Sequence, residues 1–108
     1  MAKLEETRYE DFDRLLQRLE RGILEGSMSA GLEDASDFRS GSARCSVRVF
    51  ERYSYIGSNR VSLTLTLFQN GDEPVRLSAI TAGGSQAIFF KINTWGEESF
   101  LDKLREIL

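Results

Sequence analysis

Five arginines in the middle of the chain are the side chains best suited to bind an anion. Arg44, Arg48 and Arg52 recur at every fourth position, so they share one face of any strand that contains them, and Arg60 and Arg76 fall in the next two alternating segments. Arginines with interleaved aromatic side chains on a sheet resemble in kind a platform for single-stranded nucleic acid. The sequence pI of about 5.0 and the lack of an RRM-type aromatic motif argue against a polyanion. The arginine face is therefore a candidate site for a small anionic ligand or a partner, and a solvated or self-associating sheet face is the alternative.

A glycine-rich segment is the second candidate site. Gly84, Ser85 and Gln86 belong to a Gly-Gly-Ser-Gln segment whose backbone N–H groups are suited to hold an anion in a small nest. The segment lacks the lysine and the spacing of a P-loop, so a flexible turn between strands is the competing interpretation. A pocket for an amphipathic ligand would lie between this segment and a hairpin tip, with Tyr53, Tyr55 and Trp95 in its walls; the alternative is that these aromatic side chains cap the core.

The sequence offers little for catalysis. It contains no histidine and a single cysteine, Cys45, so neither a nucleophile–base pair nor the usual histidine and thiolate metal sites are available. Cys45 is expected on the apolar side of its strand, where a thiol behaves as a small hydrophobic group. We therefore expect no catalytic residue, no metal site, no cofactor and no enzymatic activity.

The segment from Arg44 to Ala82 is expected to position these side chains on three antiparallel strands. Its clearest part runs from Val61 to Leu67, where branched apolar residues alternate with serine and threonine, the period of a strand with one buried face. Turn residues at 57–59 and 70–74 divide the segment. The strands expected from this division are 44–55, 60–68 and 75–82.

Hydrophobicity predicts which face of each strand is buried. Val47 and Val49 lie on one side of the first strand, so this side is expected to face the core, and the arginines of the same strand then point outward. Glu51 is the exception, because the same alternation places its carboxylate on the core side, where it would need an arginine or hydroxyl partner. A bulge, or a strand end that emerges beyond the helices, would also account for it.

Two amphipathic helices flank the strands. Thr7 and Glu10 have the spacing of a capping box ahead of a helix over 8–25, and Gly26 is a natural stop. Thr94 and Glu97 repeat this spacing ahead of a C-terminal helix. The two apolar stripes have the helical period: Phe12, Leu15, Leu16, Leu19 and Ile23 in the first helix, and Phe100, Leu101, Leu104, Ile107 and Leu108 in the second.

The remaining segments complete the predicted architecture. Alternation over 27–33 predicts a strand, 34–42 has the composition of a loop that Phe38 pins to the body, and 87–92 is expected to be a last strand. Each helix has one apolar stripe and each strand one apolar face. The expected class is therefore α+β, a two-layer sandwich in which an antiparallel sheet of four to five strands carries the N- and C-terminal helices on one face.

Length and charge are those of a small single domain. The 108 residues suffice for one domain, 1–108, with residues 1–6 frayed or at most a short edge strand. Residues 1–37 carry five basic and ten acidic side chains, whereas residues 38–92 carry seven basic and three acidic ones, so the expected helices are acidic and the expected sheet is basic. There is no secretory signal and no apolar run long enough to span a membrane, and a cytoplasmic location is expected.

Four segments together resemble an uncharacterised family of small bacterial cytosolic proteins. They are Glu51–Ser54, Gly57–Ser62, Gly83–Gln86 and Phe90–Glu97, and the similarity covers about residues 10–104. That family has no assigned activity, so the resemblance implies no catalytic or binding residue. The residues favour a non-enzymatic domain that binds a partner or itself, as a homodimer through the sheet. The alternative is a binder of a small anionic or amphipathic ligand at the arginine face or beside the Gly-Gly-Ser-Gln segment.

Overall fold

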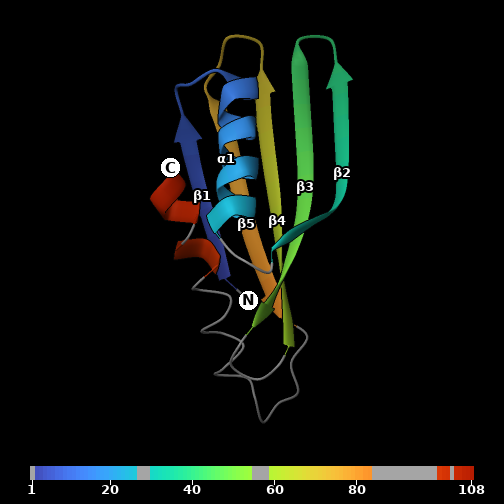
Figure 1. Cartoon of the computed structure of the whole chain (residues 1–108). Helices are drawn as coiled ribbons and strands as arrows, with labels where there is room; N and C mark the ends of the chain where they lie inside the picture. Colours follow the sequence, from blue (N-terminus) through green and yellow to red (C-terminus); the bar gives the residue numbers. More distant parts are fainter. Residues whose placement is uncertain (1, 27–29, 55–58, 84–99, 103) are drawn as a thin grey trace.

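The computed structural model describes residues 2–26, 30–54, 59–83, 100–102 and 104–108. Within them the order of elements is β1 (Ala2–Arg8), α1 (Phe12–Gly26), β2 (Gly31–Ser40), β3 (Ala43–Ser54), β4 (Asn59–Asn70) and β5 (Val75–Gly83), and residues 100–102 and 104–107 are helical. The five strands form one antiparallel sheet in the order β1-β5-β4-β3-β2 (Figure 1). The expected α+β class with an antiparallel sheet is confirmed.

The cap of α1 differs from the predicted one. Asp11 is the N-cap residue, because its carboxylate accepts a hydrogen bond from the Arg14 N–H at 3.0 Å and its carbonyl accepts one from the Leu15 N–H at 2.9 Å. The predicted capping box at Thr7 is wrong, since Thr7 lies in β1 opposite Arg76. The helix ends at Gly26, as its sequence indicates.

The core lies between α1 and the sheet, and the predicted helical stripe is confirmed. Figure 1 shows α1 lying across one side of the sheet over β5 and β4. One continuous cluster of buried side chains joins α1, the sheet and the C-terminal helical residues. Its members from α1 are Phe12, Leu15, Leu16, Leu19 and Ile23. From β4 they are Val61, Leu63, Leu65 and Leu67, and from β5 Val75, Leu77 and Ala79. From the C-terminal helical residues they are Phe100, Leu101 and Leu104.

The N-terminal residues form an edge strand instead of a frayed end. β1 pairs with β5 from Ala2 opposite Thr81 to Arg8 opposite Val75. The buried Thr81 hydroxyl also donates to the Ala2 carbonyl at 3.4 Å. Because β1 pairs with β5, the two ends of residues 2–83 lie next to each other at one edge of the sheet.

Strand β2 occupies most of the segment predicted as a loop. The strand expected over 27–33 is found at Gly31–Ser40, and residues 27–29 lie outside the described residues. Pairing with β3 overrides the serine, aspartate and glycine content of 34–42, and the turn follows at Gly41 with φ 59°. Phe38, expected to pin a loop, points out from the strand with 62% of its surface exposed.

The predicted orientation of β3 is wrong. Residues directly opposite one another in an antiparallel pair share a face. Phe50 lies opposite Leu63 and is fully buried with it. The side of β3 that faces α1 therefore carries Arg44, Ser46, Arg48, Phe50 and Arg52. The other side, with Val47 and Val49, faces away from α1.

The predicted strands and turn over 60–82 are confirmed. β4 and β5 have the expected buried faces, and Gly71 takes φ 59° in the turn between them. The predicted turn at 57–59 lies largely outside the described residues, and the predicted strand 87–92 and the start of the C-terminal helix lie wholly outside them.

We expect Phe50→Ala to lower the free energy of unfolding by about 3–5 kcal/mol and Leu65→Ala by about 2–5 kcal/mol, because each leaves a cavity in the core. Val49→Ala and Thr64→Ala, on the opposite face, should each cost less than about 1 kcal/mol. Urea unfolding at low protein concentration measures all four. A larger loss for Val49→Ala than for Phe50→Ala would restore the orientation predicted from hydrophobicity.

Candidate functional site

Arg44 lies beside the start of α1. Its guanidinium donates to both carboxylate oxygens of Asp13, at 2.8 and 3.3 Å, and its Cζ atom lies 3.8 Å from the centre of the Phe12 ring. The side chain is thus held by an ion pair and a cation–π contact on the helix side of β3. It links the strand to the first turn of the helix.

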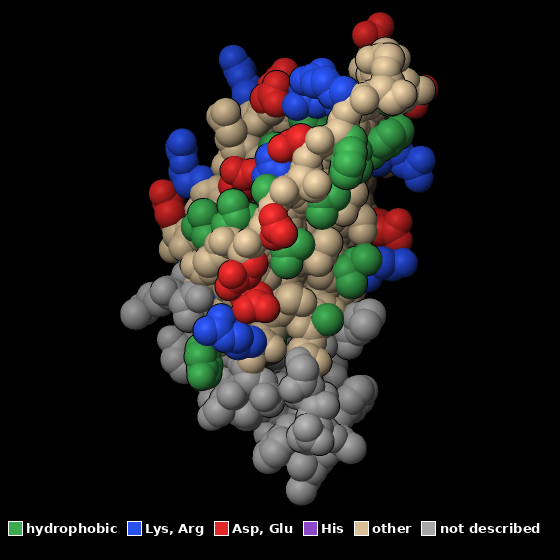
Figure 2. All heavy atoms as spheres, turned by 90° about the vertical axis from the view of Figure 1, so that its right-hand side faces the viewer, with side chains coloured by type: hydrophobic (Ala, Val, Ile, Leu, Met, Phe, Trp, Pro, Cys, Tyr) green, Lys and Arg blue, Asp and Glu red, His purple; other side chains and the backbone are tan. Residues whose placement is uncertain are grey.

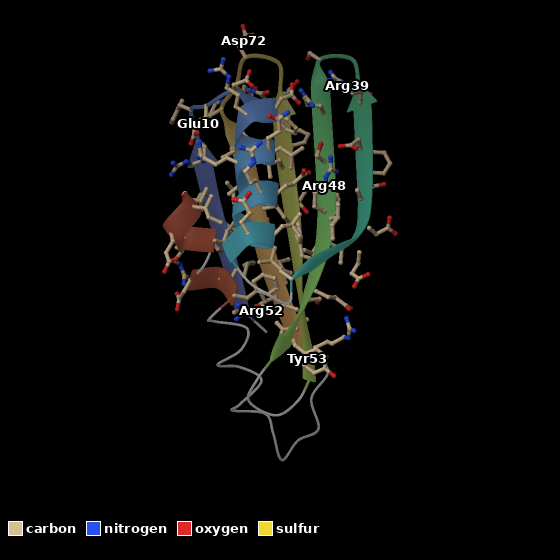
Figure 3. All side chains as sticks on the ribbon, viewed as in Figure 1. Glu10, Arg39, Arg48, Arg52, Tyr53 and Asp72 are labelled. Carbon is tan, nitrogen blue, oxygen red and sulfur yellow. The ribbon has the colours of Figure 1, made fainter. Side chains whose placement is uncertain are left out.

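Arg48 lies four residues after Arg44 on β3, and its side chain is the more buried of the two. Its side chain is 12% exposed; Nε donates to Glu20 Oε1 on α1 at 2.6 Å, and Nη1 lies 3.1 Å from Asp37 Oδ1 on β2 (Figure 3). The Ser46 hydroxyl donates to the same Asp37 oxygen at 2.6 Å. Arg48 therefore joins α1, β3 and β2 in one network, and its donors are directed at protein acceptors.

Arg52 completes the row on the helix side. Its Cζ atom lies 4.6 Å from the centre of the Phe100 ring, so it packs against the C-terminal helical residues (Figure 3). The predicted arginine face is therefore wrong in its geometry, because Arg44, Arg48 and Arg52 lie on the face of β3 that carries the buried Phe50 and faces α1. The long apolar stems of arginine explain why they are accepted there: the stems pack along the core, while the heads of Arg44 and Arg48 reach Asp13 and Glu20 of α1.

The other two arginines do lie on the opposite face, but far apart. Arg60 lies near the start of β4 and contacts Glu51 at 3.1 Å, while Arg76 stands opposite Phe68 near the other end of the same strand. Eight residues of extended strand between Arg60 and Phe68 correspond to about 27 Å. The five arginines consequently form no common anion site.

The second predicted site lies outside the described residues. This applies to Gly84, Ser85 and Gln86, and to Trp95 of the predicted pocket. Tyr53 is described; it is exposed, and the Arg60 Cζ atom lies 5.6 Å from its ring centre.

The face of the sheet opposite α1 carries a group of exposed and half-buried apolar side chains. We call this group the outer patch; its members are Phe38, Cys45, Val47, Val49, Phe68 and Ile80. Phe68 is 39% and Ile80 38% exposed, and no other element of the described chain packs over them. Figure 2 looks onto the β2 edge and shows hydrophobic side chains exposed along the right-hand part of the view, among a few charged ones.

The relief of the outer patch is shallow and its centre is uncharged. A hollow of about 300 Å³ lies between Phe38, Cys45 and Phe68, and one of about 180 Å³ lies between β2 and β3 beside Val47 and Val49. Thr64 and Thr66 fill the middle of the face between the apolar residues. Such a surface suits contact with another apolar surface rather than the binding of a small charged molecule.

The outer patch was not predicted, because hydrophobicity predicted the wrong orientation for β3. One residue nevertheless indicated the error. Glu51 was anomalous only if Val47 and Val49 faced the core. In the structure it lies on the outer face, where Arg60 binds it. A second signal was available in α1, whose Asp13 and Glu20 lie seven residues apart on one side of the helix, the side that meets Arg44 and Arg48.

Comparison with known proteins places the chain in a family. A family model described as a family of unknown function, DUF6054, matches residues 1–108. The chain belongs to the DUF6054 family. The resemblance to an uncharacterised family is therefore confirmed, and a bacterial cytosolic origin stays a prediction. No curated protein and no solved structure matches the chain.

Two further findings on the DUF6054 chain concern its described residues. No helix among them has the length and apolar character needed to cross a membrane. The same residues contain no group of acidic or cysteine side chains arranged to hold a metal ion.

Ion pairs lower the pKa of three carboxyl groups on the helix side. Hydrogen bonds from Arg18 and then Arg8 lower the pKa of Glu10 from its ordinary 4.5 to about 2. The Arg44 hydrogen bond lowers the pKa of Asp13. The Ser46 hydroxyl, followed by Arg48, lowers the pKa of Asp37. Each carboxylate is thus stabilised in its charged form by the fold.

Because the pKa of Glu10 is lower in the folded state, its contribution to stability is present above about pH 4.5 and is lost as the pH falls toward about 2. We expect Glu10→Gln to reduce the urea midpoint near neutral pH, and the difference from the unaltered protein to vanish near pH 2. Glu25→Gln, at an exposed position near the end of α1, is the matched control. A midpoint difference for Glu10→Gln that stays constant across this range would contradict the expected linkage.

Proposed function

We propose that this protein is a small non-enzymatic domain that self-associates as a homodimer through the outer patch. The observation that supports this most is the exposure of Phe38, Phe68 and Ile80 on a sheet face whose centre carries no charge. Exposed apolar side chains grouped on one face favour an interaction site in a folded protein. A second copy satisfies it without any other partner.

The arrangement of the helices supports the same proposal. We propose that α1 and the C-terminal helix share one face of the sheet, since both contribute to one core cluster. A Cβ atom at Gly22 of α1 would lie 2.5 Å from Ile107 Cδ1, so the two segments are in close contact. In a two-layer fold this leaves the other face of the sheet available to a partner.

The area of the face is adequate for a dimer. Five strands spaced by about 4.8 Å, over about eight residues each of 3.3 Å, give roughly 600 Å² in projection. Relief of the side chains increases this value toward the roughly 800 Å² that each partner contributes to a stable interface of standard size. Sheets that pack face to face in this way bring their inner side chains together at about 10 Å separation.

Association through the sheet edges is less favourable. The β2 edge is interrupted by a bulge between Leu32 and Asp34, and β1 carries an exposed Lys3–Glu5 ion pair at 3.0 Å. Bulges and charged side chains are the usual means by which edge strands avoid pairing with another chain. The face is therefore the better surface for self-association.

The alternative proposal, a binder of a small anionic or amphipathic ligand, has lost its main support. It required Arg44, Arg48 and Arg52 on an open face, and these residues instead contact Asp13, Glu20 and Phe100. Its second location, beside residues 84–86, lies outside the described residues.

We expect Phe68→Glu to abolish dimerisation, because it places two carboxylates in an apolar contact. Leu24→Glu is the matched control: Leu24 is 39% exposed, as Phe68 is, but lies on α1. Sedimentation velocity over the micromolar range should show a dimer for the unaltered protein and Leu24→Glu and a monomer for Phe68→Glu.

Native mass spectrometry of gently purified protein measures the number of subunits and any bound mass together. A clean dimer without added mass supports the proposal. A monomer that carries a reproducible adduct contradicts it and favours the ligand-binding alternative. Circular dichroism of both variants shows whether a change in mass reflects unfolding instead of dissociation.

A further inference from the structure

The outer face consists of rows of residues that run across the five strands. One row is Asp34 on β2, Val49 on β3, Thr64 on β4, Ile80 on β5 and Lys3 on β1. Neighbours in such a row are directly paired, so all five side chains point to the same side. The row therefore begins with an acid at one sheet edge and ends with a base at the other.

The charges of the whole outer face show the same asymmetry. The side formed by β2 and β3 carries Asp34, Glu51 and, at the bulge, Glu33; Arg60 of β4 lies 3.1 Å from Glu51 and 3.9 Å from Glu33 and offsets part of this charge. The side formed by β5 and β1 carries Lys3, Arg76 and Glu5. The first side is negative and the second carries a net positive charge. The middle strand β4 separates them, with Thr64, Thr66 and Phe68 on this face.

We propose that two copies pack outer face to outer face about a two-fold axis parallel to the strands and centred on β4, so that Lys3 of each copy meets Asp34 of the other. This inference rests on the proposed homodimer and specifies its geometry. A rotation about that axis reverses the strand order, so β1 of one copy covers β2 of its partner. β5 then covers β3, and β4 covers β4.

This axis brings complementary residues of the two outer faces together in two respects. It places the basic side of each copy on the acidic side of the other, twice by symmetry. It also places Phe68 opposite Phe68, Ile80 opposite Val49 and Thr64 opposite Thr64, so apolar residues meet apolar residues and hydroxyl meets hydroxyl. The same axis brings the Arg60 side chains of the two copies to the same end of β4, where each is paired with Glu51 of its own copy at 3.1 Å. Paired aromatic rings in an interface are a favourable contact beyond the area that they bury.

The other possible face-to-face axis, which runs across the strands, does not pair the basic side of one copy with the acidic side of the other. It places β2 on β2 and β1 on β1, so the acidic sides of both copies meet. Like charges brought together in this way oppose association. The intramolecular Lys3–Glu5 ion pair does not prevent the proposed contact, because both side chains are more than half exposed and such pairs are weak.

The strands of the two sheets need not be exactly aligned for the contact to form. Packed sheets cross at about 30°, and this shifts residues at the sheet margin by a few ångströms along the strand. The four-carbon stem of lysine spans such a shift. The neighbouring Glu33, at the bulge of β2, extends the acidic margin in the same region.

The test exchanges the two charges. In Lys3→Glu every dimer contains two acid–acid contacts, and in Asp34→Lys two base–base contacts, so each variant alone should dimerise about tenfold more weakly. In an equimolar mixture, one chain supplies acids at both positions and the other bases at both positions. The mixed dimer should then form with an affinity within about threefold of the unaltered protein. Native mass spectrometry separates the three dimers by mass, and sedimentation equilibrium gives their dissociation constants.

Matched controls carry the same charge changes on α1. They are Arg14→Glu for Lys3→Glu and Glu25→Lys for Asp34→Lys, both at exposed positions, and neither should change dimerisation. Weak self-association of both outer-face variants together with a preferred mixed dimer supports the axis. If the unaltered protein dimerises but the mixed dimer is no more stable than the variant homodimers, the axis is wrong and the homodimer stands. If the unaltered protein remains monomeric, the proposed function itself is wrong.

Discussion

The ion pairs between β3 and α1 determine how the sheet is oriented. Asp13 and Glu20 are seven residues apart on the helix, roughly 10 Å along its axis, and Arg44 and Arg48 are four apart on the strand, roughly 13 Å. Both pairs therefore form at once when the helix runs along the strand. Ion pairs of this kind contribute little net stability, but an arginine left without its acid under the helix would be costly. Their main effect is to select one face of β3 for the helix.

That selection has a consequence for the whole molecule. Side chains alternate along a strand, so turning Arg44 and Arg48 toward α1 turns Val47 and Val49 outward. In β4 the two demands agree, since leucines face the core and threonines face out. In β3 hydrophobicity and ion pairing favour opposite orientations, and the ion pairs to the acids of α1 select the observed one. The outer patch is the consequence of this orientation of β3. It explains how a chain of ordinary composition exposes apolar residues on one face.

The parts of the fold that were predicted from the sequence are those in which pattern and burial agree. The stripe of α1 and the alternation of β4 and β5 need only hydrophobicity, and each was placed correctly. Only the start of β2 was predicted, because Ser36, Asp37 and Gly41 indicate a loop, whereas hydrogen bonding to β3 extends the strand to Ser40. The anion site failed for a different reason. The arginines were placed outward because Val47 and Val49 were assigned to the core, and the pattern of one strand includes neither the apolar stems of the arginines nor the acids of a distant helix.

The two faces of the sheet differ in how fully their chemistry is satisfied. On the helix side, Arg48 directs its donors to Glu20, Asp37 and backbone carbonyls, which leaves that charge committed within the fold. On the outer side, Phe68 and Ile80 remain accessible. Apolar side chains offer a ligand no directional bond, so they select a partner by shape and by excluding water. A surface that is flat, uncharged at its centre and oppositely charged at its two margins is complementary to itself. Self-association through this face is therefore the role that we propose for the sheet.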